Sequence, residues 1–257
     1  MLWASGTSCD PDRAVEPANS ARFYNAIWGS QKSRAQEEKI LFLRKKAIDH
    51  SYALLGIIRN KKLLEIGCGS GKQAIFFALK GAEVSVIDAS DEALKAVSIL
   101  AREKKASIQG HRMNAEALEF ESQAFDSIYI NSVLMHVNPE KVLQECSRVL
   151  KPGGKLVITE PLRYAPFVQV YRWLSSYRTT SPQYATLKMF EQCKKHFTAY
   201  SHKEFYFFSS ALLPLGYVKN PLLKKVYAAV NRIDDYFIKI VPPVQKFCWI
   251  SVVEYVK

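Results

Sequence analysis

The sequence lacks any long hydrophobic run. No window of its 257 residues holds eighteen consecutive apolar residues, so no transmembrane helix is expected. The first twenty residues also lack the apolar core of a secretory signal. They contain Pro11 and Pro17 among small and polar residues, a composition that predicts a disordered tail.

Cysteine is scarce and scattered. The five cysteines stand at positions 9, 68, 146, 193 and 248, and none forms a CxxC pair. Neither a zinc site nor a disulfide framework is therefore indicated, and no metal site is predicted. We expect the protein to work in a reducing cytoplasm.

Acidic residues are outnumbered, with 24 Asp and Glu against 36 Lys and Arg and a formal net charge of +12. A basic excess can serve a nucleic acid, an anionic membrane surface or an anionic small substrate. Because the basic residues here are spread diffusely along the sequence, their excess can also serve solubility alone. The 48% of hydrophobic residues suits one domain with a sizeable core and some additions.

Glycine is also infrequent, yet three of the eleven glycines fall at alternate positions, 67, 69 and 71. An apolar run over 62–66 precedes them and predicts a buried strand with Glu65 near its end. Residues 72–80 then predict a helix with one apolar face. A turn of this kind lets the backbone approach a ligand, because glycine has no Cβ and tolerates positive φ. The amides that begin the helix favour a polar or anionic group.

The glycine spacing differs from the dinucleotide fingerprint G-x-G-x-x-G, since the pattern here is E-x-G-x-G-x-G. A second strand is predicted over 83–87, and it ends in Asp88, seventeen residues after Gly71. An acid in that position can accept hydrogen bonds from both hydroxyls of a ribose. The two features together indicate a ligand that contains a nucleoside.

These motifs resemble those of the class I S-adenosylmethionine-dependent methyltransferases. The block from Arg148 to Gly154, Arg-Val-Leu-Lys-Pro-Gly-Gly, resembles the corresponding turn of the same family. The resemblance covers roughly residues 60–160 and implies S-adenosylmethionine as cofactor and S-adenosylhomocysteine as product. Asn114 stands where the family usually has an acid that binds adenine, and its amide oxygen can still accept a hydrogen bond. The resemblance implies these cofactor-binding residues: Tyr24, Glu65, Gly67, Cys68, Gly69, Asp88, Ala89, Asn114, Ala115 and Asn131.

Strands alternate with helices along the chain, which predicts parallel pairing through right-handed crossovers. With the resemblance, the expected fold is α/β, a doubly wound, seven-stranded, mostly parallel sheet. N-terminal helices and a helical lid between the late strands complete it. The predicted division is a tail over 1–20, a helical cap over 21–60, a cofactor-binding core over 61–160, and an acceptor lid with the last strands of the same domain over 161–257.

Three helices are predicted in detail. The first follows Ser90 as its cap, with an apolar face of Ala93, Leu94, Val97, Ile99 and Leu100. The second begins with Asn138 as cap and Pro139 in its first turn, and ends at Pro152-Gly153-Gly154. The third begins at Pro221 and ends before Pro242. Its predicted apolar face consists of residues 222, 223, 226, 227, 230, 233, 237 and 240. The final strand is predicted over 247–256.

His136 is the candidate catalytic residue. It follows the fourth predicted strand, and a histidine that is partly neutral near pH 7 can act as a base. The alternative is that it shapes the site or contacts the cofactor. Methyl transfer itself mainly requires that donor and acceptor are brought together and oriented.

Three function classes compete. The first is methyl transfer to a small, largely apolar or aromatic acceptor, suggested by the Tyr- and Phe-rich segment after residue 161. The second is RNA methylation, suggested by the charge, although no Asn-Pro-Pro-Tyr motif follows strand four. The third is a non-catalytic module that binds the cofactor or a membrane surface through the basic amphipathic helix near 221–241.

Overall fold

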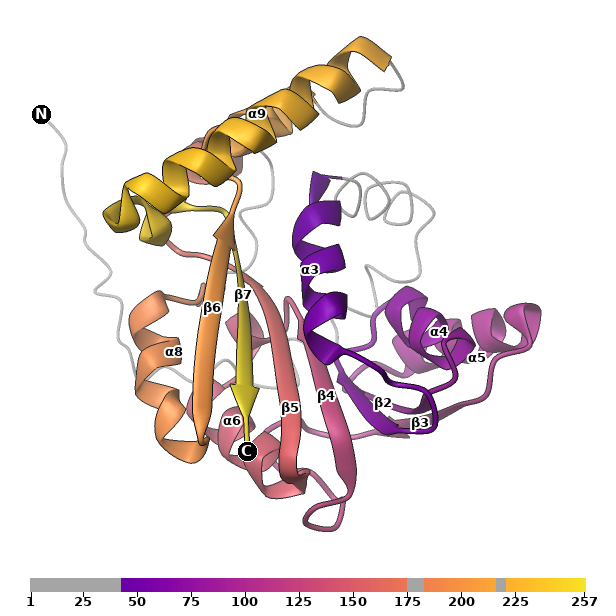
Figure 1. The fold of residues 1–257 in the computed structure, drawn as a ribbon. Helices are drawn as coiled ribbons and strands as arrows, with labels where there is room; N and C mark the ends of the chain where they lie inside the picture. The colour runs from indigo at the N-terminus through magenta and orange to yellow at the C-terminus, as the bar shows by residue number, and fades with distance from the viewer. Residues whose placement is uncertain (1–42, 175–182, 216–220) are drawn as a thin grey trace, which may run out of the picture.

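The computed structural model describes residues 43–174, 183–215 and 221–257. They form one seven-stranded sheet in the order β3-β2-β1-β4-β5-β7-β6 (Figure 1). Pairing is parallel except for β7, which runs antiparallel to both β5 and β6. The predicted fold class is confirmed. The strands are β1 Lys62–Ile66, β2 Glu83–Asp88, β3 Ile108–Arg112, β4 Phe125–Asn131, β5 Leu150–Pro161, β6 Ala199–Phe205 and β7 Ile250–Val256.

Helices cover both faces of this sheet, and each face has its own core. On one face α3 (Lys45–Leu55), α4 (Lys72–Leu79) and α5 (Asp91–Lys104) bury side chains such as Phe77 and Val97. On the other face α6 (Pro139–Val149) and α8 (Leu187–Cys193) do the same. The central strands read as near-continuous apolar runs because both of their faces are covered.

The remaining helices follow the late strands. They are α7 (Pro166–Leu174), α9 (Pro221–Ile240) and the short 3-10 helices η1 (Leu134–His136), η2 (Lys194–His196), η3 (Phe208–Leu215) and η4 (Pro242–Phe247). In Figure 1, α9 lies across the end of the sheet at which β6 ends. Among the described helices, none is long and apolar enough to cross a bilayer.

The helix after Asn138 begins as predicted, since the Asn138 side chain accepts a hydrogen bond from the Lys141 amide at 3.3 Å. Its predicted end is wrong. The helix stops at Val149, because Leu150 turns to an extended conformation and is fully buried as the first residue of β5. Pro152, Gly153 and Gly154 therefore lie within β5, where its pairing with β4 shifts register.

The helix after Ser90 is also capped as predicted, with Ser90 Oγ accepting from the Ala93 amide at 3.2 Å. One member of its predicted apolar face is wrong, because Ile99 is exposed. Two residues of helix turn the chain by about 200°, so Ile99 points away from the side that buries Val97.

The apolar face predicted for the helix after Pro221 is corrected in the same way. Val226, Ile233 and Ile240 are exposed, whereas Asn231 and Asp234 are buried. The rotation of α9 about its axis is fixed by polar contacts to η3, and the apolar period alone does not reveal them.

Candidate cofactor site and active site

The glycine turn leads from β1 into α4. Gly67, Gly69 and Gly71 all have positive φ, at 75°, 50° and 78°. A Cβ on Gly67 would lie 2.3 Å from Cγ2 of Val133, and one on Gly71 would lie 2.7 Å from Cγ2 of Val97. The turn is thus packed tightly against the residues after β4 and against α5, and only glycine fits at positions 67 and 71.

Asp88 ends β2 directly beside this turn. Its Oδ2 accepts from the Gly69 amide at 3.2 Å and from the Cys68 thiol at 3.7 Å, and its Oδ1 accepts from the Ser90 amide at 2.9 Å. Burial raises the pKa of Asp88, and the Ser90 and Gly69 amides oppose that shift. The acid and the glycine turn therefore meet at one place, and the neighbouring Ala89 is exposed.

Glu65 lies beneath the turn, almost completely buried. It accepts a hydrogen bond from the Ala74 amide, and its Oε2 is buried without a partner among the described residues. Burial and the nearby Asp88 raise its pKa well above the ordinary value. A tight glycine cradle, an acid at its rim and a buried polar atom lacking a partner together fit a site that holds a polar, nucleoside-containing cofactor.

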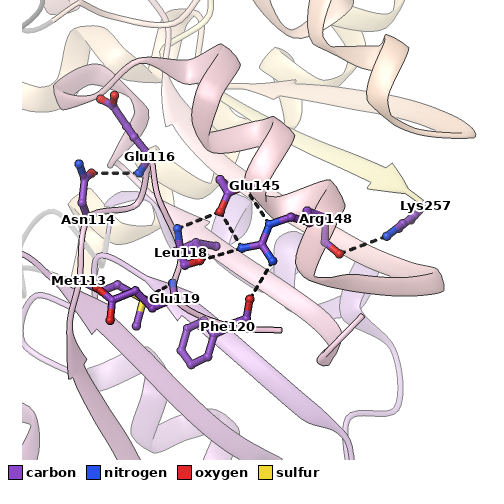
Figure 2. A network of polar contacts seen from close by, with 9 residues as sticks. All are labelled: Met113, Asn114, Glu116, Leu118, Glu119, Phe120, Glu145, Arg148 and Lys257. Atoms are coloured by element: carbon purple, nitrogen blue, oxygen red, sulfur yellow. Dashed lines mark hydrogen bonds and ion pairs between the residues drawn. The ribbon is translucent and has the colours of Figure 1, made fainter. Parts of the chain in front are cut away.

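The segment after β3 carries Asn114 and Ala115. Asn114 is exposed, and its Oδ1 accepts from the Glu116 amide at 3.0 Å, whereas Ala115 is buried. Two residues of α6 hold the continuation of this segment in place (Figure 2). Arg148 donates to the carbonyl oxygens of Leu118 at 2.7 Å and Phe120 at 2.8 Å.

Glu145 completes this clamp. It accepts two hydrogen bonds from Arg148, at 2.9 and 2.8 Å, and one from the Leu118 amide at 2.9 Å (Figure 2). The Arg148 side chain lowers the pKa of Glu145, so the pair is charged at neutral pH. A bidentate pair fixes both partners in one geometry. Arg148 is the first residue of the turn motif noted in the sequence, and the structure gives it this positioning role.

We expect Arg148→Gln to weaken binding of S-adenosylhomocysteine by roughly five- to twentyfold, about 1–2 kcal/mol, because the segment that carries Asn114 loses its fixed position. Isothermal titration calorimetry measures this. Lys151→Gln is the matched control, since it removes the Lys151–Asp126 ion pair nearby without touching the segment. Equal affinities in both variants and wild type would contradict the positioning role.

A partly buried polar cluster lies where β4 ends. Arg44 donates to Ser132 Oγ at 2.8 Å and to Asn131 Oδ1 at 2.9 Å, and Ser132 Oγ donates to Asn131 Oδ1 at 3.2 Å. Ser132 has φ of 61°, a conformation that non-glycine residues rarely adopt and that several contacts must hold. Burial lowers the pKa of Arg44, opposed by Tyr129, Glu160 and Tyr206.

Glu160 near the end of β5 supports the same turn. Its Oε1 accepts from the amides of Val133 at 2.6 Å and Leu134 at 2.8 Å, and its Oε2 has no partner among the described residues. Burial raises the pKa of Glu160 to about 7. The carboxyl lies inside the protein, and its two hydrogen bonds fix the backbone of the turn between β4 and η1.

His136 is the last residue of η1, and its amide donates to the Val133 carbonyl at 2.9 Å. Burial lowers the pKa of His136 to about 4. The imidazole is therefore neutral at pH 7, in the form that can accept a proton.

The structure thus brings Glu65, Cys68, Gly69 and Asp88 together and joins them to the turn after Asn131 through the contact of Val133 with the glycine turn. Tyr24 lies outside the described residues. No group of three His, Cys, Asp or Glu side chains able to hold a metal occurs in the described part of the chain.

Sequence reasoning missed Arg44, Ser132 and the role of Arg148. Glu160 offered a signal, since it is an acid at a strand end like Asp88. Arg44 offered none, because Arg44-Lys45-Lys46 has the pattern of a solvated helix surface.

Residues 64–158 match the family described as "Methyltransferase domain". The ubiquinone biosynthesis O-methyltransferase of Paracidovorax citrulli (strain AAC00-1) is 35% identical over 146 residues, which is 54% of this chain and 60% of that protein. The chain therefore spans less than two thirds of this curated relative.

Two solved structures share the fold. Phosphoethanolamine N-methyltransferase 2 of Haemonchus contortus in complex with S-adenosyl-L-methionine has a TM-score of 0.58 at 20% identity, over 81% of this chain and 52% of that one. A Haloferax volcanii complex of the Trm112 methyltransferase activator with a methyltransferase gives 0.63 at 12% identity, over 91% and 96%. At these identities the likeness concerns the fold alone. Residues 64–158 thus carry a methyltransferase domain, and the sheet that contains it has the fold of these two structures.

Proposed function

We propose that this protein transfers a methyl group from S-adenosylmethionine to a small, largely apolar or aromatic acceptor. The observation that carries the proposal is the meeting of the Asp88 carboxylate with the Gly69 amide in a turn whose packing admits only glycine at positions 67 and 71. The proposal is supported by the matched domain and by relatives named as ubiquinone biosynthesis O-methyltransferases.

On the cofactor side, Asp88 would accept hydrogen bonds from the ribose hydroxyls. The exposed Ala89 backbone and the Asn114–Ala115 pair would bind the adenine. The rest of the cofactor site would be lined by Gly67, Cys68 and Gly69, with Glu65 beneath them. Tyr24 is a further proposed contact of the cofactor. The bound cofactor supplies an electrophilic methyl group on a sulfonium.

On the acceptor side, the turn from Asn131 to His136 would face the donor. Arg44 and Glu160 hold this turn rigid through the hydrogen bonds described above, which favours a fixed approach of the acceptor. His136 would take the acceptor's proton where one has to be removed. Residues 161–240, which include α7, α8 and α9, would roof the acceptor. The proposed division of the chain is 1–20, 21–60, 61–160 and 161–257, the last comprising this lid and the last strands of the same domain.

The test uses the purified full chain and a labelled methyl donor. Calorimetry should show binding of S-adenosylhomocysteine and none of NAD. Incubated with tritium-labelled S-adenosylmethionine and a cell extract, the protein should label a small, organic-extractable product. Label in RNA would instead favour the nucleic-acid alternative, and cofactor binding without any labelled product would favour a non-catalytic module.

We also propose a cytoplasmic location. The four described cysteines, Cys68, Cys146, Cys193 and Cys248, are free thiols, which agrees with a reducing compartment.

A further inference from the structure

One side of α9 carries a row of large apolar side chains in solvent. Val226, Ile233, Tyr236 and Ile240 are exposed by 40%, 57%, 69% and 54%. At about 100° per residue they share one side of the helix, here called the apolar ridge. The buried Asn231 precedes Ile240 by nine residues, or two and a half turns, and so lies on the opposite side.

Polar contacts keep the apolar ridge in solvent. Asp234 accepts from the amides of Phe208 at 2.7 Å and Ser209 at 3.1 Å, and it is itself buried. On the neighbouring side Asp235 forms an ion pair with Lys46 of α3. A rotation of α9 that buried the ridge would leave the buried Asp234 carboxylate without these partners, at a high cost in free energy. Exposure of the ridge is therefore a fixed feature of the fold.

Cationic side chains line the ridge along its length. Lys225, Arg232 and Lys239 are all exposed and follow one another at intervals of seven residues. That spacing places them in one row, here called the basic row, on the side of α9 next to the ridge and away from Asp234. The exposed acid on this helix, Asp235, is neutralised by Lys46.

We propose that the apolar ridge and the basic row together dock this protein onto the surface of an anionic lipid bilayer. An exposed apolar stripe bordered by cations is the pattern of helices that lie in the plane of a membrane interface. The ridge enters the boundary between headgroups and acyl chains, and the row meets lipid phosphates of opposite charge. The net charge of +12 acts in the same direction. The inference concerns binding alone and does not depend on methyl transfer.

Flotation of the full-length protein with vesicles tests this. We expect binding to phosphatidylcholine vesicles that contain phosphatidylglycerol and little binding to phosphatidylcholine alone. Raising the salt from about 0.1 M to about 1 M, which shortens the screening length from about 10 Å to about 3 Å, should weaken binding strongly.

Two variants separate the parts of the surface. Lys225→Gln, Arg232→Gln and Lys239→Gln together should weaken binding roughly a hundredfold, about fivefold for each charge. Ile233→Asp with Ile240→Asp should weaken it at least tenfold, because the ridge no longer enters the lipid. Thermal melting should be unchanged in both, since the substituted side chains are exposed.

Matched controls lie on α5. Lys95→Gln, Arg102→Gln and Lys104→Gln remove the same charge from exposed positions, and Ile99→Asp replaces an exposed isoleucine. Both should lose far less binding than the corresponding α9 variants. If the α5 triple variant lost as much vesicle binding as the α9 triple variant, overall charge would explain the binding, and that result would overturn the proposal. So would a dimer in analytical ultracentrifugation that the ridge variant dissociates, because the occupant would then be a second copy of the chain.

Discussion

Replacing Asp88 with alanine should weaken the binding of S-adenosylhomocysteine by at least two orders of magnitude. Each hydrogen bond from a ribose hydroxyl to a carboxylate contributes about 1.5–3 kcal/mol, and two such bonds are lost. The variant also loses the acceptor for the Gly69 and Ser90 amides, which loosens the turn that approaches the ligand. Isothermal titration calorimetry gives the affinity directly.

Two control variants distinguish a direct contact of Asp88 with the ligand from a general effect of removing a negative charge. Asp88→Asn keeps one acceptor oxygen and should bind between wild type and alanine. Asp91→Ala removes an acid three residues away, at the start of α5, where it pairs with Arg112 at 3.2 Å and is partly exposed. It should bind nearly as wild type does. If Asp88→Ala bound as tightly as wild type, Asp88 would not contact the ligand.

Replacing His136 with alanine should lower turnover by roughly two to four orders of magnitude if the acceptor must lose a proton. Cofactor affinity should stay nearly the same. Because burial lowers the pKa of His136 to about 4, the neutral form predominates at every pH above that value. His136 should therefore add no inflection to the pH dependence of wild-type turnover between pH 5 and pH 8, whereas a histidine of ordinary pKa would add one near 6.5. Steady-state assays with the identified acceptor measure both effects.

His50→Ala is the matched control, because His50 lies on α3 and packs against Phe205 at a ring distance of 5.5 Å. Unchanged turnover of His136→Ala at saturating acceptor and cofactor would remove this imidazole from the reaction. A joint loss of affinity and thermal stability would instead identify His136 as a packing residue. Orientation of the two substrates would then be the main source of rate.

The geometry of the proposed cofactor side is predictable from sequence because its determinants are local. Each signal sets the conformation of the residues that carry it: the short apolar run, the three glycines and the acid after the next strand. Parallel pairing then brings Glu65 and Asp88 to the same edge of the sheet. The caps at Ser90 and Asn138 are predictable for the same reason, since a cap involves residues three positions apart.

The geometry of the proposed acceptor side depends on contacts between distant segments. Arg44 donates a hydrogen bond to Asn131, which lies 87 residues further along the chain. No sequence pattern distinguishes Arg44 from the solvated lysines beside it. The rotation of α9 is likewise set by Asp234 and η3, so part of the apolar face predicted from its period, including Val226, Ile233 and Ile240, is exposed. Periodicity identifies a helix well, but it does not reveal which polar contacts decide the side that is buried.

The position of β7 has a consequence for how the chain assembles during synthesis. Strand β6 is at the edge of the sheet, and its partner is β7, whose residues follow it by about fifty positions. Strands β1 to β5 can pair with one another as soon as they leave the ribosome, whereas β6 keeps two unpaired edges until Ile250–Val256 emerges. Such late, long-range pairing slows folding and exposes a strand to wrong partners. The nascent protein should therefore be most prone to aggregation between the synthesis of β6 and that of β7.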